Sequence, residues 1–153
     1  MVNVHALGGP AMLAAARAAI DETPARRPLL SAVTVLTSHD QTTLQAIGLQ
    51  GTPAEAVGRL AALATNAGLD GVVCSPQEAA LVRDHCGESF RRITPGVRPV
   101  GAALDDQRRI QTPASAIAAG ATDLVVGRPI TRSAEPAGVV EMILDEMRVT
   151  AGD

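Results

Sequence analysis

The stretch "TPAEAVGRLAALATNAGLDGVVCS", residues 52–75, indicates the fold class of this chain. Thr52 and Glu55 stand at the spacing of a helix capping box, and apolar residues then recur at helical spacing as far as Gly68. A short β-branched run at 71–75 follows almost at once. A helix that leads directly into an apolar strand is the repeating unit of an α/β protein.

The same alternation extends from this stretch toward both ends of the chain. The sequence predicts strands over 2–6, 28–38, 71–75, 92–99 and 123–130, and helices over 11–20, 52–68, 76–87, 112–121 and 135–149. The strand starts lie about 30 residues apart on average, which is the size of a strand–helix–strand unit. Strict alternation predicts a parallel sheet that is covered by helices.

Two architectures fit five such units. One is an open, doubly wound sheet of five strands. The other is part of a (β/α)8 TIM barrel, which normally needs about 250 residues, so that five of its eight units would occupy about this length. The chain opens directly on a strand, which favours the barrel. We expect residues 1–153 to form a single domain, an incomplete barrel.

Composition limits the classes of function. Of the 153 residues 46% are hydrophobic and 19% are charged, as in folded globular proteins, and the formal net charge of −3 gives no basic field for nucleic acid. All 13 basic residues are arginine, because the chain contains no lysine. With no signal peptide and no apolar run long enough to span a membrane, we expect a reduced, cytoplasmic protein in which Cys74 is a small core residue.

Polar side chains gather where the predicted strands end, and ligands bind at the carboxyl ends of strands in either architecture. Two arginines, adjacent hydroxyl residues and glycine-rich turns there indicate an anionic ligand. The candidates are His5, Thr37, Ser38, Ser75, residues 95–98, Gly127 and Arg128.

Arg98 and Arg128 stand beside prolines in "TPGVRP" (94–99) and "VVGRPIT" (125–131). A barrel commonly holds a phosphate at the loops after its last two strands, where these arginines fall. Gly127 allows the backbone to approach a phosphate, and an arginine offers it a planar fork of donors. The alternative is that each arginine pairs with a surface carboxylate.

Three further features leave their alternatives open. The segment "GAALDDQRRI" (101–110) is either a solvated loop or a flap that folds over a ligand, with Gln107 as a neutral donor to phosphate. His5 is either a base or ligand at a strand end, or a hydrogen-bonded core histidine. His39 and His85 are expected on the surface. The His, Cys and acidic residues lack metal-binding spacing, so no metal site is predicted.

Six segments, in chain order, resemble the orotidine 5′-phosphate decarboxylase family of the bacterial type. They are "VNVHALGG" (2–9), "AVTVLTS" (32–38), "GLDGVVCS" (68–75), "TPGVRP" (94–99), "DDQRRIQTP" (105–113) and "VVGRPIT" (125–131). The resemblance implies a (β/α)8 barrel, usually a homodimer, that converts orotidine 5′-monophosphate (OMP) to UMP and CO2 in pyrimidine biosynthesis without a cofactor.

The resemblance also implies roles for the matching residues. Thr37 would contact the substrate, with Ser38 beside it near the pyrimidine. Arg98 and Gln107 would belong to the loop that grips the phosphate. Gly127 and Arg128 would hold the phosphate at the end of the last strand. These roles agree with the phosphate site that the strand ends predict.

The chain departs from the family at the catalytic motif. That motif is an Asp-x-Lys-x-x-Asp segment at the end of the family's third strand, and its lysine protonates the carbon that CO2 leaves. This chain has no lysine, and its first strand resembles the family's fourth. We therefore expect the carboxyl-terminal part of a decarboxylase, without the first three strand–helix units and inactive alone. The alternatives are a noncatalytic module that binds a nucleotide phosphate, or another phosphate-binding barrel lyase.

Overall fold

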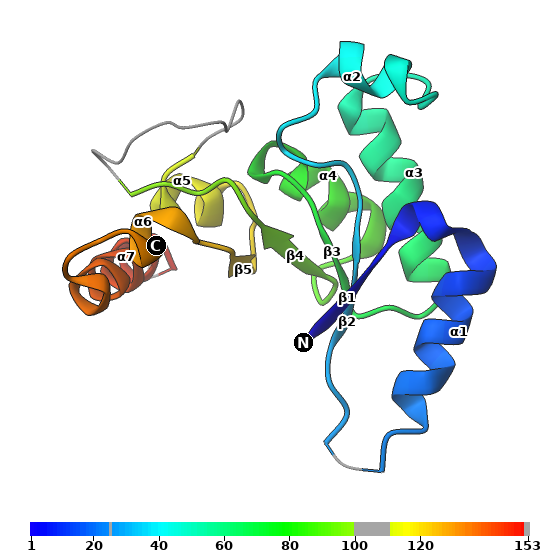
Figure 1. Cartoon of the computed structure of the whole chain (residues 1–153), viewed down its shortest axis with the longest axis horizontal. Helices are drawn as coiled ribbons and strands as arrows, with labels where there is room; N and C mark the ends of the chain where they lie inside the picture. Colours follow the sequence, from blue (N-terminus) through cyan, green and yellow to red (C-terminus); the bar gives the residue numbers. More distant parts are fainter. Residues whose placement is uncertain (25, 100–110, 152–153) are drawn as a thin grey trace.

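The computed structural model describes residues 1–24, 26–99 and 111–151, and its five strands form one parallel sheet in chain order (Figure 1). The strands are β1 (Val2–His5), β2 (Leu30–Val33), β3 (Gly71–Val73), β4 (Arg91–Thr94) and β5 (Asp123–Leu124). A doubly wound sheet reverses its strand order at a switch point, whereas a barrel adds each new strand on the same side of the last. The sequential order therefore excludes the doubly wound alternative and confirms the partial barrel.

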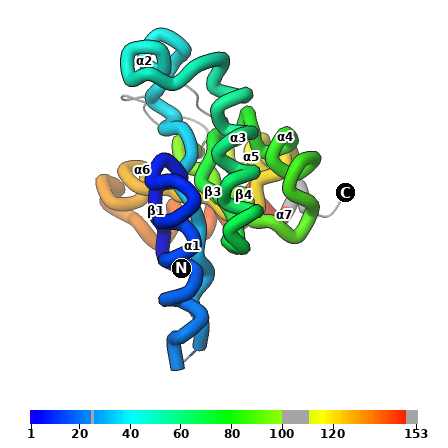
Figure 2. The backbone as a smooth tube through the Cα atoms, turned by 90° about the vertical axis from the view of Figure 1, so that its right-hand side faces the viewer, coloured from blue at the N-terminus to red at the C-terminus, as the bar shows by residue number. Residues whose placement is uncertain are grey.

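Helices connect the strands and pack against one another in succession, α3 on α4, α4 on α5 and α5 on α7 (Figure 2). This row of neighbouring helices is a segment of the outer ring of a barrel. The helical elements are the 3-10 turn η1 (Ala6–Gly8), α1 (Gly9–Asp21), α2 (Gln41–Ala46), α3 (Pro53–Asn66), α4 (Pro76–Cys86), α5 (Pro113–Ala118), α6 (Arg128–Thr131) and α7 (Pro136–Ala151).

Helix α3 begins and ends as the sequence predicts. The Thr52 side chain accepts a hydrogen bond from the Glu55 amide at 3.3 Å, and the Glu55 carboxylate accepts one from the Thr52 amide at 2.8 Å. This reciprocal pair satisfies two donors that the first helical turn leaves without partners. After the helix, Gly68 adopts a left-handed φ of 73°, which a side chain would disfavour.

The predicted strands are longer than the observed ones, most of all at β2, β4 and β5. β4 ends at Thr94 instead of 99. β2 ends at Val33 instead of 38, and the unpredicted helix α2 follows it, capped by the Asp40 carboxylate, which accepts from the Thr43 amide at 2.9 Å. β5 ends at Leu124 instead of 130. Past β2, Thr34 and Val35 stay buried although their backbone has left the ladder. Past β5, Val125 is exposed and Val126 is half-buried.

Most of the buried apolar residues in the described part of the chain form two clusters. The larger one joins β1–β3 with α1, α3 and α4, and includes Leu13, Val57 and Val72, each with no exposed surface. The smaller one lies around α5, with Val97, Ala116 and Ala121 at its centre. Cys74 belongs to the larger cluster and has no exposed surface, as predicted.

Arg92 is a buried charged residue that fixes the loops at the amino ends of β4 and β5. Its guanidinium donates to the carbonyls of Gly120 at 2.6 Å, Phe90 at 2.7 Å and Glu88 at 3.0 Å. Only 5% of the residue is exposed, so these carbonyls replace the water that the side chain loses on burial. The contacts tie the loop before β4 to the loop before β5.

Candidate functional site

The two arginines of the predicted phosphate site follow neighbouring, paired strands. Thr94 at the end of β4 lies in register with Leu124 at the end of β5. Arg98 and Arg128 each lie four residues beyond these partners. Since the carboxyl ends of parallel strands share one edge of the sheet, this spacing directs both loops to the same edge. Thr37 likewise lies four residues beyond Val33, the last residue of β2.

Arg98 is held at this edge with its charge in the interior. The residue is 6% exposed, its amide donates to the Gln111 carbonyl at 2.9 Å, and its Nη1 donates to the Val97 carbonyl at 3.0 Å. Its Nε is buried without a hydrogen-bond partner. Among the described residues no carboxylate forms an ion pair with Arg98. Pairing of Arg98 with a surface carboxylate stays an open alternative, because Asp105 and Asp106 lie outside the described residues.

Gly127 and Arg128 begin the short helix α6 instead of ending a strand, which corrects the predicted strand over 123–130. The Gly127 carbonyl accepts from the amides of Ile130 at 2.9 Å and Thr131 at 3.1 Å. A Cβ atom at Gly127 would meet no atom within 4 Å, so one side of its backbone is open to an approaching ligand. Arg128 is half-buried at the first position of the helix.

The two hydroxyl residues after β2 have different surroundings. Thr37 is 6% exposed, whereas Ser38 is exposed. Ser75, at the end of the next strand, is fully buried and caps α4, because its Oγ accepts from the Gln77 amide at 3.3 Å. The Ser75 hydroxyl thus has a structural role at the start of a helix, which its place before Pro76 predicts.

Two other predictions at this edge have different outcomes. His5 is exposed on the terminal strand β1, so the interpretation of His5 as a core histidine is wrong. Gln107 lies outside the described residues, and its predicted role as a donor to phosphate stays a prediction.

Buried threonine hydroxyls at the strand ends are a feature that our sequence reasoning missed. The Thr34 hydroxyl donates to the Val73 carbonyl at 2.7 Å, and the Thr94 hydroxyl donates to the Asp123 carbonyl at 3.2 Å. Each bond links neighbouring strands next to the proposed site. The signal in the sequence is a threonine inside an otherwise apolar run, where a buried hydroxyl needs a partner.

Within residues 1–24, 26–99 and 111–151 no group of three or more His, Cys, Asp or Glu side chains is arranged to hold a metal ion. None of the described helices is long and apolar enough to cross a membrane.

Comparison with known proteins assigns the family. The model of the orotidine 5′-phosphate decarboxylase / HUMPS family matches residues 1–143. The chain belongs to this family. The family resemblance that the sequence motifs carry is thereby confirmed.

Individual relatives agree with this assignment. The chain is 60% identical over 147 residues to an orotidine 5′-phosphate decarboxylase of Alkalilimnicola ehrlichii, and the match covers 96% of this chain. It is 56% identical over 143 residues, or 94% of this chain, to the same enzyme of Vibrio cholerae. The crystal structure of orotidine 5′-phosphate decarboxylase from Lactobacillus acidophilus matches 95% of this chain with a TM-score of 0.79 and 38% identity.

These relatives are longer than this chain. The match spans 62% of each of the two decarboxylase sequences and 62% of the Lactobacillus acidophilus structure. More than a third of each relative therefore has no counterpart here.

Proposed function

We propose that this chain binds the phosphate of OMP and of its product UMP as one part of a decarboxylase site. In this proposal Arg98, Arg128 and the open backbone at Gly127 hold the phosphate, together with Gln107. Thr37 contacts the substrate, and Ser38 lies beside it near the pyrimidine. A pairing of two copies, which the family resemblance implies, belongs to the same proposal.

The observation that supports the phosphate site best is the buried guanidinium of Arg98. A buried charge is costly unless a partner of opposite charge or several acceptors compensate it. The described residues give Arg98 one carbonyl acceptor on Nη1 and none on Nε. A phosphate, with several acceptor oxygens and a negative charge, is suited to the donors that remain.

The reaction needs a group that this chain lacks. When CO2 leaves OMP, its bond to the pyrimidine breaks and the electron pair stays on the ring carbon, which must then take up a proton. The family uses a lysine ammonium as the donor, and this sequence contains no lysine. The proposal therefore assigns substrate binding to this chain and proton transfer to a part of the enzyme that this sequence does not supply.

The absence of lysine also favours a second candidate, a noncatalytic module that binds a nucleotide phosphate. Both candidates require Arg98 and Arg128 to bind a phosphate. The third alternative, a different phosphate-binding barrel lyase, loses support because the curated relatives reported above are orotidine 5′-phosphate decarboxylases.

Titration of UMP and uridine against Arg128→Ala tests the phosphate site. A charge-assisted fork to phosphate contributes about 1.5–3 kcal/mol, so the Kd for UMP should rise about tenfold to a hundredfold. Uridine has no phosphate, and its weaker binding should change little. Arg128→Lys should restore the affinity only in part, because an ammonium group lacks the planar fork.

Arg132→Ala is the matched control for this experiment. Arg132 is the exposed residue that follows α6, so its removal changes the net charge equally without touching the proposed site. We expect the Kd for UMP to stay within about twofold in this variant, as for other changes at exposed sites. Equal losses of affinity for UMP and for uridine in Arg128→Ala would show that Arg128 has only a structural role.

A further inference from the structure

Gln111 carries a buried polar atom that the proposed function does not use. Within the part of the chain that the structure describes, the Arg98 Nε and the Gln111 Oε1 are both buried without a hydrogen-bond partner. The first atom is a donor and the second is an acceptor. Nearly all buried polar side-chain atoms in folded proteins are paired, so two unpaired atoms of opposite kind call for a physical reason.

Backbone contacts place Gln111 beside Arg98. The Arg98 amide donates to the Gln111 carbonyl at 2.9 Å, and Val97 forms a parallel bridge with Gln111. The Arg98 Nη1 donates to the Val97 carbonyl at 3.0 Å, which turns the guanidinium back toward this bridge. The guanidinium and the Gln111 side chain therefore lie beside the same pair of backbones.

The backbone of Gln111 is fixed on both sides, whereas its side chain can rotate. On one side it accepts the Arg98 amide, and on the other Thr112 caps α5, since the Thr112 hydroxyl accepts from the Ser115 amide at 3.1 Å. Gln111 itself is half-buried. Its side-chain amide can thus turn toward the guanidinium without any movement of the strand ends or of α5.

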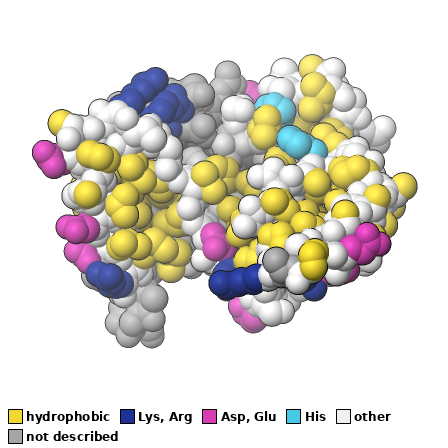
Figure 3. All heavy atoms as spheres, turned by 60° about the horizontal axis from the view of Figure 1, so that its bottom comes forward, with side chains coloured by type: hydrophobic (Ala, Val, Ile, Leu, Met, Phe, Trp, Pro, Cys, Tyr) yellow, Lys and Arg dark blue, Asp and Glu magenta, His cyan; other side chains and the backbone are white. Residues whose placement is uncertain are grey.

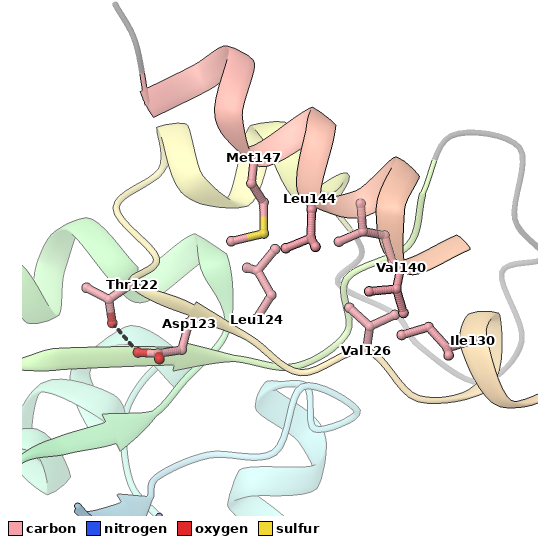
Figure 4. Close-up of a pocket in the computed structure, with 9 residues that line it drawn as sticks. Thr122, Asp123, Leu124, Val126, Ile130, Val140, Leu144 and Met147 are labelled. Atoms are coloured by element: carbon pink, nitrogen blue, oxygen red, sulfur yellow. Dashed lines mark hydrogen bonds between the residues drawn. The ribbon is translucent and has the colours of Figure 1, made fainter. Parts of the chain in front are cut away.

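The groove between β5 and α7 does not offer a comparable polar site. It has a volume of about 340 Å³, and its polar side chains, Thr122 and Asp123, bond to each other at 2.7 Å. The other side chains that line it are apolar and come from β5, the loop after it, α6 and α7 (Figure 4). Figure 3 shows hydrophobic side chains gathered over this region, at the left of that view. The described lining of this groove therefore presents no donor to an anion.

We propose that Gln111 is a positioning residue for Arg98, an inference that rests on the proposed phosphate site. With phosphate bound, the Gln111 side-chain oxygen accepts a hydrogen bond from the Arg98 Nε. A guanidinium is planar, so this one contact fixes the direction of its remaining donors and turns them to the phosphate oxygens. The phosphate supplies the opposite charge, and the glutamine supplies a neutral acceptor.

A neutral acceptor suits this position better than a carboxylate does. A carboxylate beside Arg98 would pair with the guanidinium and compete with the phosphate for it, whereas an amide oxygen orients the group and leaves its charge available. In the free chain both atoms are buried and unpaired, which lowers the stability of the free state. Binding of the phosphate brings them together and removes this cost.

Gln111→Leu tests the inference, because it removes the acceptor and keeps a side chain of similar volume. We expect the Kd for UMP to rise about threefold to tenfold, the effect of one net hydrogen bond, and the Kd for uridine to change little. The midpoint of denaturant unfolding of the free chain should not fall, because the variant loses an unpaired buried acceptor. Gln77→Leu makes the same change at an exposed residue at the start of α4, and should leave the Kd for UMP within about twofold.

Two further variants show whether Gln111 acts through Arg98. In an Arg98→Ala background, Gln111→Leu should change the Kd for UMP by less than about twofold, because no guanidinium is left to position. Gln111→Glu should weaken UMP binding more than Gln111→Leu does, because its carboxylate pairs with Arg98 and repels the phosphate. A full additive loss in the double variant, or tighter UMP binding in Gln111→Glu, would overturn the inference. So would equal losses for UMP and uridine in Gln111→Leu with a lower unfolding midpoint.

The Arg128→Ala titration separates a failure of this inference from a failure of the phosphate site. If Arg128→Ala weakens UMP selectively and Gln111→Leu does not, Gln111 does not position Arg98 and the phosphate site stands. If neither change is selective for UMP over uridine, the phosphate site and the inference drawn from it both fail.

Discussion

At the scale of the residue, Gly71 shows how closely two strands of this sheet approach each other. A Cβ atom at this position would lie 2.5 Å from the Arg91 carbonyl oxygen and 2.6 Å from the Arg91 Cβ. The carbonyl oxygen is part of the backbone of the neighbouring strand, and the Cβ is bonded directly to that backbone. Neither atom can turn away as the end of a flexible side chain would. The register of β3 with β4, which pairs Gly71 with Arg91, therefore depends on glycine.

Gly71→Ala should destabilise the chain by about 1–3 kcal/mol, the typical cost of forcing extra atoms into a packed site. Gly58→Ala is the matched control, because a Cβ there meets only Leu81 Cδ2, at an ordinary 3.8 Å. Gly58 lies in the middle of α3, so Gly58→Ala should stabilise the helix by about 0.5–1 kcal/mol. Denaturant unfolding followed by circular dichroism measures the free energy of unfolding of both variants. A similar change in the two variants would show that the close approach at Gly71 does not require glycine.

The sequence predicted some of these residue-scale features and not others. The placement of Thr37 and Arg98 at one edge of the sheet was predictable, because the ends of parallel strands meet at one edge. The interior role of Arg92 was not predictable, because nothing in the local pattern shows that its guanidinium reaches the Gly120 carbonyl, 28 residues away. The exposure of His5 could not be predicted, because burial there depends on what lies beside β1 and a short apolar run does not show this.

At the scale of the element, the capping box of α3 couples helix stability to pH. The pKa of Glu55 is lowered from its ordinary value of 4.5, mainly because its carboxylate accepts the Thr52 backbone amide and then the Thr52 hydroxyl. A lowered folded-state pKa means that the ionised form stabilises the folded chain. This stabilisation is complete above pH 4.5 and is lost as the pH falls through the lower folded-state value.

Glu55→Gln should therefore make the chain less stable than the unmodified protein above pH 4.5. The difference should shrink as the pH is lowered below 4.5, because protonated Glu55 loses its advantage over glutamine. Thermal melts over this pH range measure the difference. Glu141→Gln, an exposed change inside α7, is the control and should show no such convergence. A Glu55→Gln difference that is constant with pH would refute the coupling.

Whole elements were more predictable than their ends. The start of α5 follows the sequence, since the Thr112 hydroxyl accepts from the Ser115 amide at 3.1 Å as the Thr-Pro signal predicts. The end of β5 does not follow the sequence. The apolar residues Val125, Val126 and Ile130 fit a strand, a loop or a short helix equally well. Which of these forms is decided by pairing with β4, and the ladder stops after Leu124.

At the scale of the whole molecule, the order of the strands could be predicted but the surroundings of the two ends of the sheet could not. The strand order and the five helices α1, α3, α4, α5 and α7 were predictable, because five β/α units of regular length admit few topologies. The short helices α2 and α6 were not. The two clusters of apolar residues, and the open groove beside α7, were not predictable, since they depend on which neighbours surround each end of the sheet.

We expect no measurable decarboxylation of OMP by this chain alone, followed as the loss of substrate absorbance. The carbon that CO2 leaves needs a positioned proton donor, and the sequence has no lysine to act as one. Contacts to the phosphate position the substrate. They lower the barrier to decarboxylation only when a proton donor is also positioned at the reacting carbon. Turnover within a few hundredfold of a full-length relative would show that another group supplies the proton.

Arg128→Ala separates genuine residual turnover from contamination by the decarboxylase of the expression host. Activity that belongs to this chain should fall in the variant if Arg128 binds the phosphate, whereas activity of a contaminant should not change. Addition of the unmatched segment of the Alkalilimnicola ehrlichii decarboxylase, as a separate polypeptide, should then raise turnover in the unmodified chain and less so in Arg128→Ala. Full activity in both mixtures would mean that the phosphate is held elsewhere, even though the barrel had closed.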